Sequence, residues 1–206
     1  MAKKPSPNPP PDLSTEEKIK EAARKVFTQK GYAATRTREI AETAGINLAL
    51  LNYYFRSKQK LFEQVMLEKV QQLFGLIAPV IVDPTTTLES KIEKVVSLYI
   101  DMISEHPDLP IFVLSEIRNH PDHFANTFKI GELLQHSSFI QQLKERRPEI
   151  HPFHFLMNTL GMSIFPFIAR PVFETSGVAN ATQFNNMMQE RKILIPRWTN
   201  AILNSI

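Results

Sequence analysis

Apolar residues recur at helical rather than strand spacing along most of the chain. Between residues 37 and 66 the pattern divides into three short segments, each opened by a side chain that can cap a helix. The first segment opens at Thr37, the second spans residues 48–55, and the third follows Ser57. We find no repeats and no strand-like alternation of useful length, so the pattern predicts an all-α protein.

Gly45 and Asn47 lie between the first two segments. Glycine adopts the left-handed conformation that ends a helix at little cost, and asparagine is a favoured N-cap. Two short helices joined by a glycine-containing turn are the plan of the helix-turn-helix, in which the second helix enters the DNA major groove. The sequence therefore predicts residues 48–55 as a recognition helix.

The predicted recognition helix has two different faces. At about 100° per residue, Leu48, Leu51 and Phe55 cluster on the side that we expect to face the core. The remaining surface lacks the Lys and Glu that are typical of a solvated helix. It carries Ala49, Leu50, Asn52, Tyr53 and Tyr54.

This second face has side chains that suit a DNA groove. The Asn52 amide can pair with adenine, and Ala49 or Leu50 can contact a thymine methyl group. Tyrosine hydroxyl and lysine ammonium groups can reach phosphates, which positions a helix without reading sequence. On periodicity alone, the alternative is a helix packed on both sides within a larger bundle.

The segment from Thr37 to Phe62 resembles the N-terminal domain of TetR-family transcriptional regulators. It carries the pattern T-R-x-I-A-x-x-A-G-I-x-x-x-x-L-x-Y-Y-F-x-S-K-x-x-L-F. One departure is Asn52, where many members have Tyr. The clear resemblance covers about the first third of the chain, and beyond it only the all-helical layout agrees. Together with the free face, the resemblance predicts DNA contacts at Arg36, Thr37, Arg38, Asn47, Leu48, Ala49, Leu50, Asn52, Tyr53, Tyr54 and Lys58.

Composition limits the class of protein. The chain has 206 residues, 43% of them hydrophobic and 22% charged, which is ordinary for a soluble globular protein. It has no Cys, which excludes disulfides, thiolate zinc sites and thiol-based redox sensing. No uninterrupted apolar run approaches the roughly 20 residues that cross a bilayer, and the start lacks the apolar core of a secretory signal. We therefore expect a cytoplasmic protein without a membrane partner.

The net charge of +3 is unevenly distributed along the chain. Residues 1–60 contain 12 Lys+Arg and six Asp+Glu, whereas residues 61–206 contain 12 and 15. The positive excess therefore coincides with the helix-turn-helix pattern, as expected of a nucleic-acid-binding face. A chance fluctuation in a solvated surface would explain the charge alone, but not its coincidence with the motif.

We divide the chain into a disordered tail (1–13), a helix-turn-helix domain (14–60) and a helical effector-binding and dimerisation domain (61–206), with about nine helices in all. Prolines in the tail remove backbone donors and fix φ, so it cannot form a helix. The fourth helix is expected to end before Pro79, and one long helix to cover 122–147. By the resemblance, the fourth helix transmits effector binding to the DNA-binding domain.

The two last long helices are strongly apolar. By the resemblance they pair with their copies in a homodimer, which would also space two recognition helices for a palindromic operator. The alternative is that both helices complete the core of a monomer. The expected interface residues are Phe153, Met157, Leu160, Ile164, Met187, Leu194, Trp198 and Ile202.

The middle helices are rich in Phe and Met. The resemblance implies a pocket for a small apolar effector, whose binding would change the angle of the fourth helix and weaken operator binding. The alternative is plain core. The expected pocket residues are Phe74, Met102, Phe112, Phe128, Phe155 and Thr159.

Metal and catalytic sites find little support in the sequence. His120 with His123, and His151 with His154, have a spacing that can chelate a metal, but each pair adjoins a proline and lacks an acidic cluster. There is no glycine-rich phosphate loop, nucleophile elbow or clear carboxylate pair. We predict no metal site, no cofactor and no catalytic residue, hence no enzyme.

Two functional classes remain. The first is a ligand-responsive, homodimeric transcriptional regulator, most often a repressor in the family that the chain resembles. The alternative is a DNA-binding protein of the same fold without a small-molecule effector, acting through a protein partner or architecturally. A helical ligand carrier, the weaker third option, would show no salt-dependent binding to duplex DNA.

Overall fold

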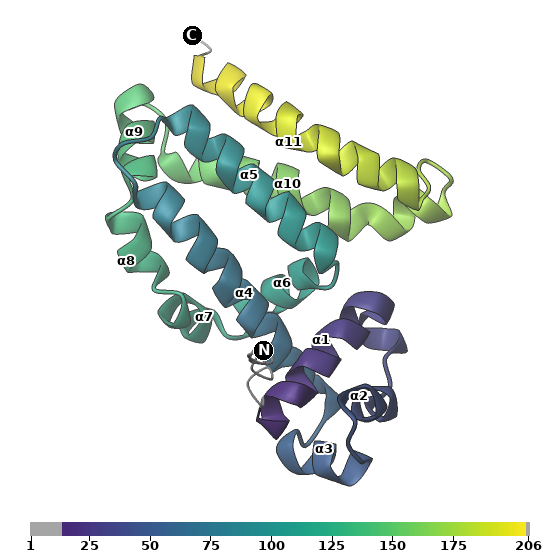
Figure 1. Cartoon of the computed structure of the whole chain (residues 1–206). Helices are drawn as coiled ribbons and strands as arrows, with labels where there is room; N and C mark the ends of the chain where they lie inside the picture. The colour runs from purple at the N-terminus through teal and green to yellow at the C-terminus, as the bar shows by residue number, and fades with distance from the viewer. Residues whose placement is uncertain (1–13, 205–206) are drawn as a thin grey trace, which may run out of the picture. The chain divides into compact units, whose positions relative to one another are not determined.

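The computed structural model describes residues 14–204 (Figure 1). The tail predicted at residues 1–13 lies outside the described residues. Within them the chain forms eleven α-helices and no strand, which confirms the predicted all-α class. The helices are α1 (Thr15–Ala34), α2 (Thr37–Ala44), α3 (Leu48–Tyr54), α4 (Lys58–Val82), α5 (Leu88–Glu105), α6 (Leu109–Asn119), α7 (Pro121–Thr127), α8 (Ile130–Gln135), α9 (Ser138–Arg146), α10 (Pro152–Thr175) and α11 (Ala181–Asn204).

The chain divides into two compact units, an N-terminal unit of residues 1–65 and a C-terminal unit of residues 66–206. The division falls inside α4, which begins in the first unit and continues in the second. This is five residues beyond the boundary that we placed after residue 60 from the sequence.

Short-range signals in the N-terminal unit set where its helices begin and end. The Ser14 hydroxyl accepts a hydrogen bond from the Glu17 backbone N–H at 3.3 Å, which caps α1. Gly31 interrupts the regular helix with φ 72°, a left-handed conformation that glycine adopts without strain. The prediction that Thr37 caps α2 is wrong. Arg36 is the N-cap and Thr37 the first helical residue, because the chain stays extended through Arg36.

The core of the N-terminal unit is built from one face of each of its helices. Its aromatic corner joins Phe27 of α1 to Phe62 of α4, with ring centroids 5.0 Å apart in an edge-on arrangement. Tyr32 lies against the same Phe62 ring at 4.7 Å. Each such apolar side chain contributes roughly 1.5–3 kcal/mol when fully buried. The other large buried residues are Ile19, Val26, Ile40, Leu51, Phe55, Leu61 and Val65.

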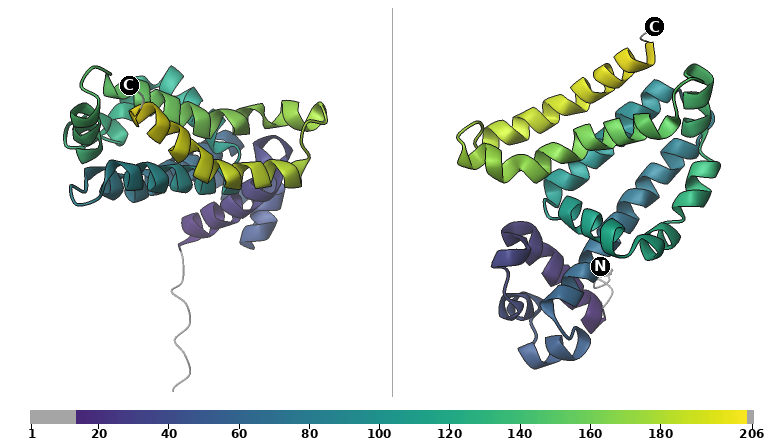
Figure 2. Two further views of the ribbon diagram at one scale, coloured as in Figure 1. Left: turned by 90° about the horizontal axis from the view of Figure 1, so that it is seen from above. Right: turned by 180° about the vertical axis from the view of Figure 1, so that it is seen from behind.

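The core of the C-terminal unit is centred on α5, which packs on α10 and α11 (Figure 2). Ile92, Val96 and Ile100 recur every four residues along α5 and are almost completely buried. Phe184 and Ile195 of α11 belong to the same cluster. Thr87 caps the start of α5, and His106 follows its end.

Two predictions for the C-terminal unit are wrong. The fourth helix does not end before Pro79 but continues to Val82, because the fixed φ of proline is compatible with a helix even though its missing N–H leaves one bond unmade. The helix expected over 122–147 is three helices, α7, α8 and α9. Lys129 adopts a left-handed φ of 47° before α8, and Ser137 caps α9. These two breaks raise the helix count above the predicted nine.

The end of α4 is fastened to α9 by buried polar contacts. The Ser138 hydroxyl donates to the Asp83 carbonyl at 2.7 Å, and Gln142 Nε2 donates to the Thr86 carbonyl at 3.0 Å. Lys91, whose side chain is fully buried, donates from Nζ to the same Thr86 carbonyl at 2.6 Å. Burial lowers the pKa of Lys91, and these acceptors compensate for its desolvation. The loop at 83–87 is therefore a fixed anchor for the end of α4.

Two helices, α4 and α10, are long and apolar enough to cross a membrane by length and composition alone. No uninterrupted apolar run suggested this, because charged and polar residues such as Lys69 and Arg170 lie among the apolar ones. Core helices of soluble proteins meet the same criteria. The absence of a membrane partner stays a prediction.

Candidate nucleic-acid interface

Capping residues hold α2 and α3 as two distinct helices. Gly45 has φ 70° and ends α2, and the Ile46 N–H donates back to the Ala41 carbonyl at 3.0 Å. Asn47 Oδ1 accepts from the Leu50 N–H at 2.8 Å and so caps α3. Both features agree with the sequence prediction. The Asn47 side chain therefore serves as the cap of α3, and the predicted contact with DNA would be additional to this hydrogen bond.

The two faces of α3 are arranged as the sequence predicted. Leu51 is 0% exposed and Phe55 is buried, whereas Leu48 is half-buried. Tyr53 is 81% exposed, and its ring meets the Tyr54 ring edge-on at 5.5 Å. The alternative of a helix packed on both sides does not hold. The exposed residues of α3 are Ala49, Leu50, Asn52, Tyr53 and Tyr54.

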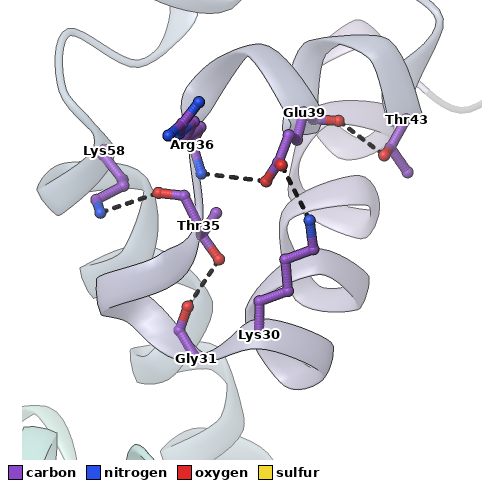
Figure 3. Close-up of polar contacts among 7 residues, drawn as sticks. All are labelled: Lys30, Gly31, Thr35, Arg36, Glu39, Thr43 and Lys58. Atoms are coloured by element: carbon purple, nitrogen blue, oxygen red, sulfur yellow. Dashed lines mark hydrogen bonds and ion pairs between the residues drawn. The ribbon is translucent and has the colours of Figure 1, made fainter.

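The start of α2 presents two cations. Arg36 and Arg38 are exposed, and Thr37 between them is half-buried. Figure 3 shows the Arg36 side chain turned away from Glu39, while its backbone N–H points toward the Glu39 carboxylate. A helix N-terminus carries partial positive charge, so this end of α2 favours anions such as phosphate.

The structure gives Lys58 a different role from the predicted phosphate contact. Its ammonium donates to the Tyr32 carbonyl at 2.8 Å and to the Thr35 carbonyl at 3.0 Å (Figure 3). It also lies over the Tyr32 ring, 4.2 Å from the centroid. Two backbone carbonyls and one aromatic ring, from the end of α1 and the residue after it, therefore surround this charge. The sequence prediction missed this because Lys58 is 26 and 23 residues away from its partners.

Three further residues shape the same corner and were not among the predicted site residues. The buried Thr35 donates from its hydroxyl to the Gly31 carbonyl at 2.7 Å. Lys30 Nζ donates to Glu39 Oε1 at 2.9 Å, and Glu39 Oε2 accepts from the Arg36 N–H at 3.3 Å (Figure 3). The bond from Lys30, followed by the one from Arg36, holds the pKa of Glu39 below its usual value. Opposite charges nine residues apart across a helix break give no readable signal in the sequence.

The six residues predicted to line an effector pocket come from α4, α5, α6, α10 and the connection between α7 and α8, and the pocket stays a prediction. Phe74 of α4 stacks on Phe128 at 4.7 Å. Phe155 belongs instead to the core around α5, where it meets Phe139 at 6.5 Å, and Thr159 donates to the Phe155 carbonyl. The other two, Met102 and Phe112, are buried.

The structure contains a surface hollow of about 600 Å³ at α8 and α9. It includes none of the six predicted pocket residues. Its lining is largely polar and consists of Leu134, Gln135, His136, Ser137, Ile140, Gln141, Lys144 and Glu145.

The residues predicted for the dimer interface lie largely on exposed surface of α10 and α11. Met157 is 59% exposed, and Leu160, Ile164 and Leu194 are half-buried. The exposed members of the set are Phe153, Met157, Met187, Trp198 and Ile202. On α10, Phe153 and Met157 lie on a different face from the buried Phe155, whereas Ile164 packs against the core, so the dimer interface stays a prediction.

The histidines have local partners. His151 Nδ1 accepts from the Phe153 N–H at 3.3 Å as the cap of α10, and His120 lies 3.4 Å from Glu116. Within residues 14–204, no group of three or more His, Cys, Asp or Glu side chains could hold a metal ion.

The family comparison matches the N-terminal unit of the structure. Residues 19–65 match the family model described as bacterial regulatory proteins, tetR family. The probable HTH-type transcriptional regulator YttP of Bacillus subtilis is 33% identical over 108 residues, 51% of either chain. The HTH-type transcriptional repressor KstR2 of Mycolicibacterium smegmatis is 29% identical over 124 residues, 54% of this chain and 60% of KstR2. The chain thus spans about half the length of the curated relatives it matches.

A solved structure extends the likeness to most of the chain. The transcriptional regulator FadR from Bacillus subtilis, in complex with stearoyl-CoA, has a TM-score of 0.57 at 16% identity. The likeness covers 87% of this chain and 96% of FadR. At that identity it establishes the fold alone. These similar proteins are transcriptional regulators and not enzymes, which agrees with the sequence prediction.

Proposed function

We propose that this chain is a cytoplasmic, homodimeric TetR-like repressor that binds a palindromic operator and is released by a small apolar effector, and the match of residues 19–65 to the tetR family model supports the proposal. The exposed face of α3 carries the proposal. Its amide, phenol and small apolar side chains lie on a capped helix in the part of the sequence that holds the chain's positive excess.

We assign the exposed residues to two kinds of contact. Asn52, Ala49 and Leu50 read base edges, through an amide and through apolar contacts with thymine methyl groups. Arg36, Arg38 and the tyrosine hydroxyl groups contact phosphates, which fixes the orientation of α3 without reading sequence. Lys58 supports these contacts indirectly, because its ammonium is bonded to the connection between α1 and α2.

The exposed apolar faces of α10 and α11 support a homodimer. Contiguous apolar surface of this kind marks an interaction site, since it would otherwise remain in water. A two-fold dimer also places two copies of α3 about 34–36 Å apart, one helical turn of DNA. The two half-sites then form a palindrome.

Effector binding is proposed to act through α4. The stack of Phe74 on Phe128 places an apolar group of α4 against the shorter helices, where a ligand would change the position of α4. FadR, which has the same fold, was solved with stearoyl-CoA. The alternative is a regulator of this fold that responds to a protein partner instead of a small molecule.

Selection from random duplexes tests the DNA-binding proposal. The purified full chain is incubated with a pool of randomised duplexes, and bound DNA is amplified and sequenced. We expect enrichment of a palindromic sequence, with an affinity that falls steeply as salt increases. Recovery of no sequence, together with binding that does not depend on salt, would contradict the proposal.

A further inference from the structure

Glu39 is a carboxylate on a surface that the proposed function requires to be positive. It is the third residue of α2, in the same helical turn as Arg38 and three residues after the Arg36 cap. DNA phosphates repel an unpaired carboxylate near the residues that contact them. The way in which the chain holds this charge therefore bears on DNA binding.

Both oxygens of Glu39 have partners inside the N-terminal unit. Oε1 accepts from Lys30 Nζ at 2.9 Å, and Oε2 accepts from the Arg36 backbone N–H at 3.3 Å (Figure 3). Thr43 donates from its hydroxyl to the Glu39 carbonyl at 2.7 Å, one turn further along α2. Lys30 precedes the Gly31 break in α1, so one carboxylate joins the end of α1 to the start of α2.

A second set of contacts fixes the chain between these two helices. Lys58 binds the Tyr32 and Thr35 carbonyls, and Thr35 binds the Gly31 carbonyl. With this connection held by α4, the distance that the Lys30–Glu39 pair spans is set independently of the pair. The pair is therefore not needed to hold the end of α1 near the start of α2. Exposed ion pairs also contribute little to the free energy of unfolding.

We propose that Lys30 and Glu39 form a neutralising pair for DNA binding, in which Lys30 compensates the charge of Glu39 so that this carboxylate does not repel the phosphates that Arg36 and Arg38 contact. Neither member of the pair touches DNA. This inference rests on the proposed function, because it assigns a role to residues beside the assigned phosphate contacts.

A double-mutant cycle tests the pair. Fluorescence anisotropy measures the affinity of the full chain for a selected duplex with Lys30→Met, Glu39→Gln and both together. We expect Lys30→Met alone to weaken binding about tenfold, because it leaves an unpaired carboxylate near the phosphates. Glu39→Gln alone should change affinity by about twofold at most, since its amide oxygen still accepts from the Arg36 N–H. The double variant should regain most of the loss.

Two matched variants separate the effect of the Lys30–Glu39 pair on DNA binding from the effect of net charge alone. Lys30→Arg keeps the ion pair and should bind like the unchanged chain. Glu42 is another exposed carboxylate on α2 and is not part of the pair. Glu42→Gln should therefore add the same gain with Lys30 or Met at position 30. Melting temperatures should stay equal across the set, which excludes loss of the fold.

The outcomes distinguish this inference from the function on which it rests. In one outcome the unchanged chain binds the duplex, and Lys30→Met causes the same loss with Glu or Gln at position 39. This would overturn the Lys30–Glu39 pair alone, because Lys30 would then contact DNA itself. No salt-dependent duplex binding by the unchanged chain would overturn the proposed function and the pair with it.

Discussion

The N-terminal and C-terminal units both expose large apolar side chains, but the residues that surround these side chains differ between the two units. On α3 the exposed Leu50 lies beside an amide and two phenols, and the exposed Arg36 and Arg38 lie at the start of the neighbouring α2. On α10 and α11 the exposed Met157 and Trp198 belong to two long helices, of which α10 is largely apolar and α11 mixes apolar and polar residues. Exposure alone therefore does not identify a partner. The polar groups around the exposed apolar residues favour DNA for α3 and another apolar surface for α10 and α11.

The largest effect should follow from placing charge on the apolar faces of the C-terminal unit. Combining Met157→Glu with Trp198→Glu should turn the homodimer into a monomer, because carboxylates cannot be buried there without partners. Duplex affinity should then fall about 100-fold or more, since each monomer binds only one half-site. Light scattering measures the mass and fluorescence anisotropy the affinity.

Ile193 provides the control for this pair of substitutions. It is 58% exposed on α11, but five residues before Trp198 it lies on a different face of the helix. Ile193→Glu should leave the dimer intact. A dimer that survives Met157→Glu with Trp198→Glu would place the interface elsewhere.

A smaller effect should separate the two faces of α3. Leu51→Ala removes a completely buried side chain and should lower the free energy of unfolding by about 2–5 kcal/mol. Leu50→Ala changes an exposed neighbour and should alter it by about 0.5 kcal/mol at most, while it weakens binding to duplexes with thymine at the contacted position. Denaturation followed by circular dichroism measures stability. Equal destabilisation by both would contradict the assigned faces.

The smallest effect concerns how Lys58 supports binding. Lys58→Met removes the bonds to the Tyr32 and Thr35 carbonyls, so duplex affinity should fall severalfold while its dependence on salt stays the same. A phosphate contact would instead reduce the slope of log affinity against log salt by about 1. Lys60→Met, on the same turn of α4, is the control for general charge. A reduced slope for Lys58→Met alone would restore the direct contact that the sequence suggested.

The accuracy of the sequence predictions follows the range of the interactions involved. The turn between α2 and α3 follows from neighbouring residues, such as Asn47, whose side chain accepts from the Leu50 N–H, and it was predicted correctly, although the cap of α2 was misplaced by one residue. The bonds of Lys58 link residues more than 20 positions apart, and no periodicity encodes them. Pro79 did not end α4, because the fixed φ of proline is compatible with a helix. The chain after the helix is then anchored to α9 by Ser138. The expected pocket stays a prediction, because helical spacing places Phe155 on a face without saying which helix covers it.

Photo-crosslinking from α3 tests the central claim most directly. Tyr53 is replaced by the photoreactive analogue p-benzoylphenylalanine, and the full chain is irradiated with a selected duplex. Ile111, an exposed residue of α6, is replaced in the same way as the control. We predict a covalent adduct with DNA from position 53 and none from position 111. A chain that binds the duplex but forms no adduct from position 53 would contradict the assignment of α3 as the surface that meets DNA.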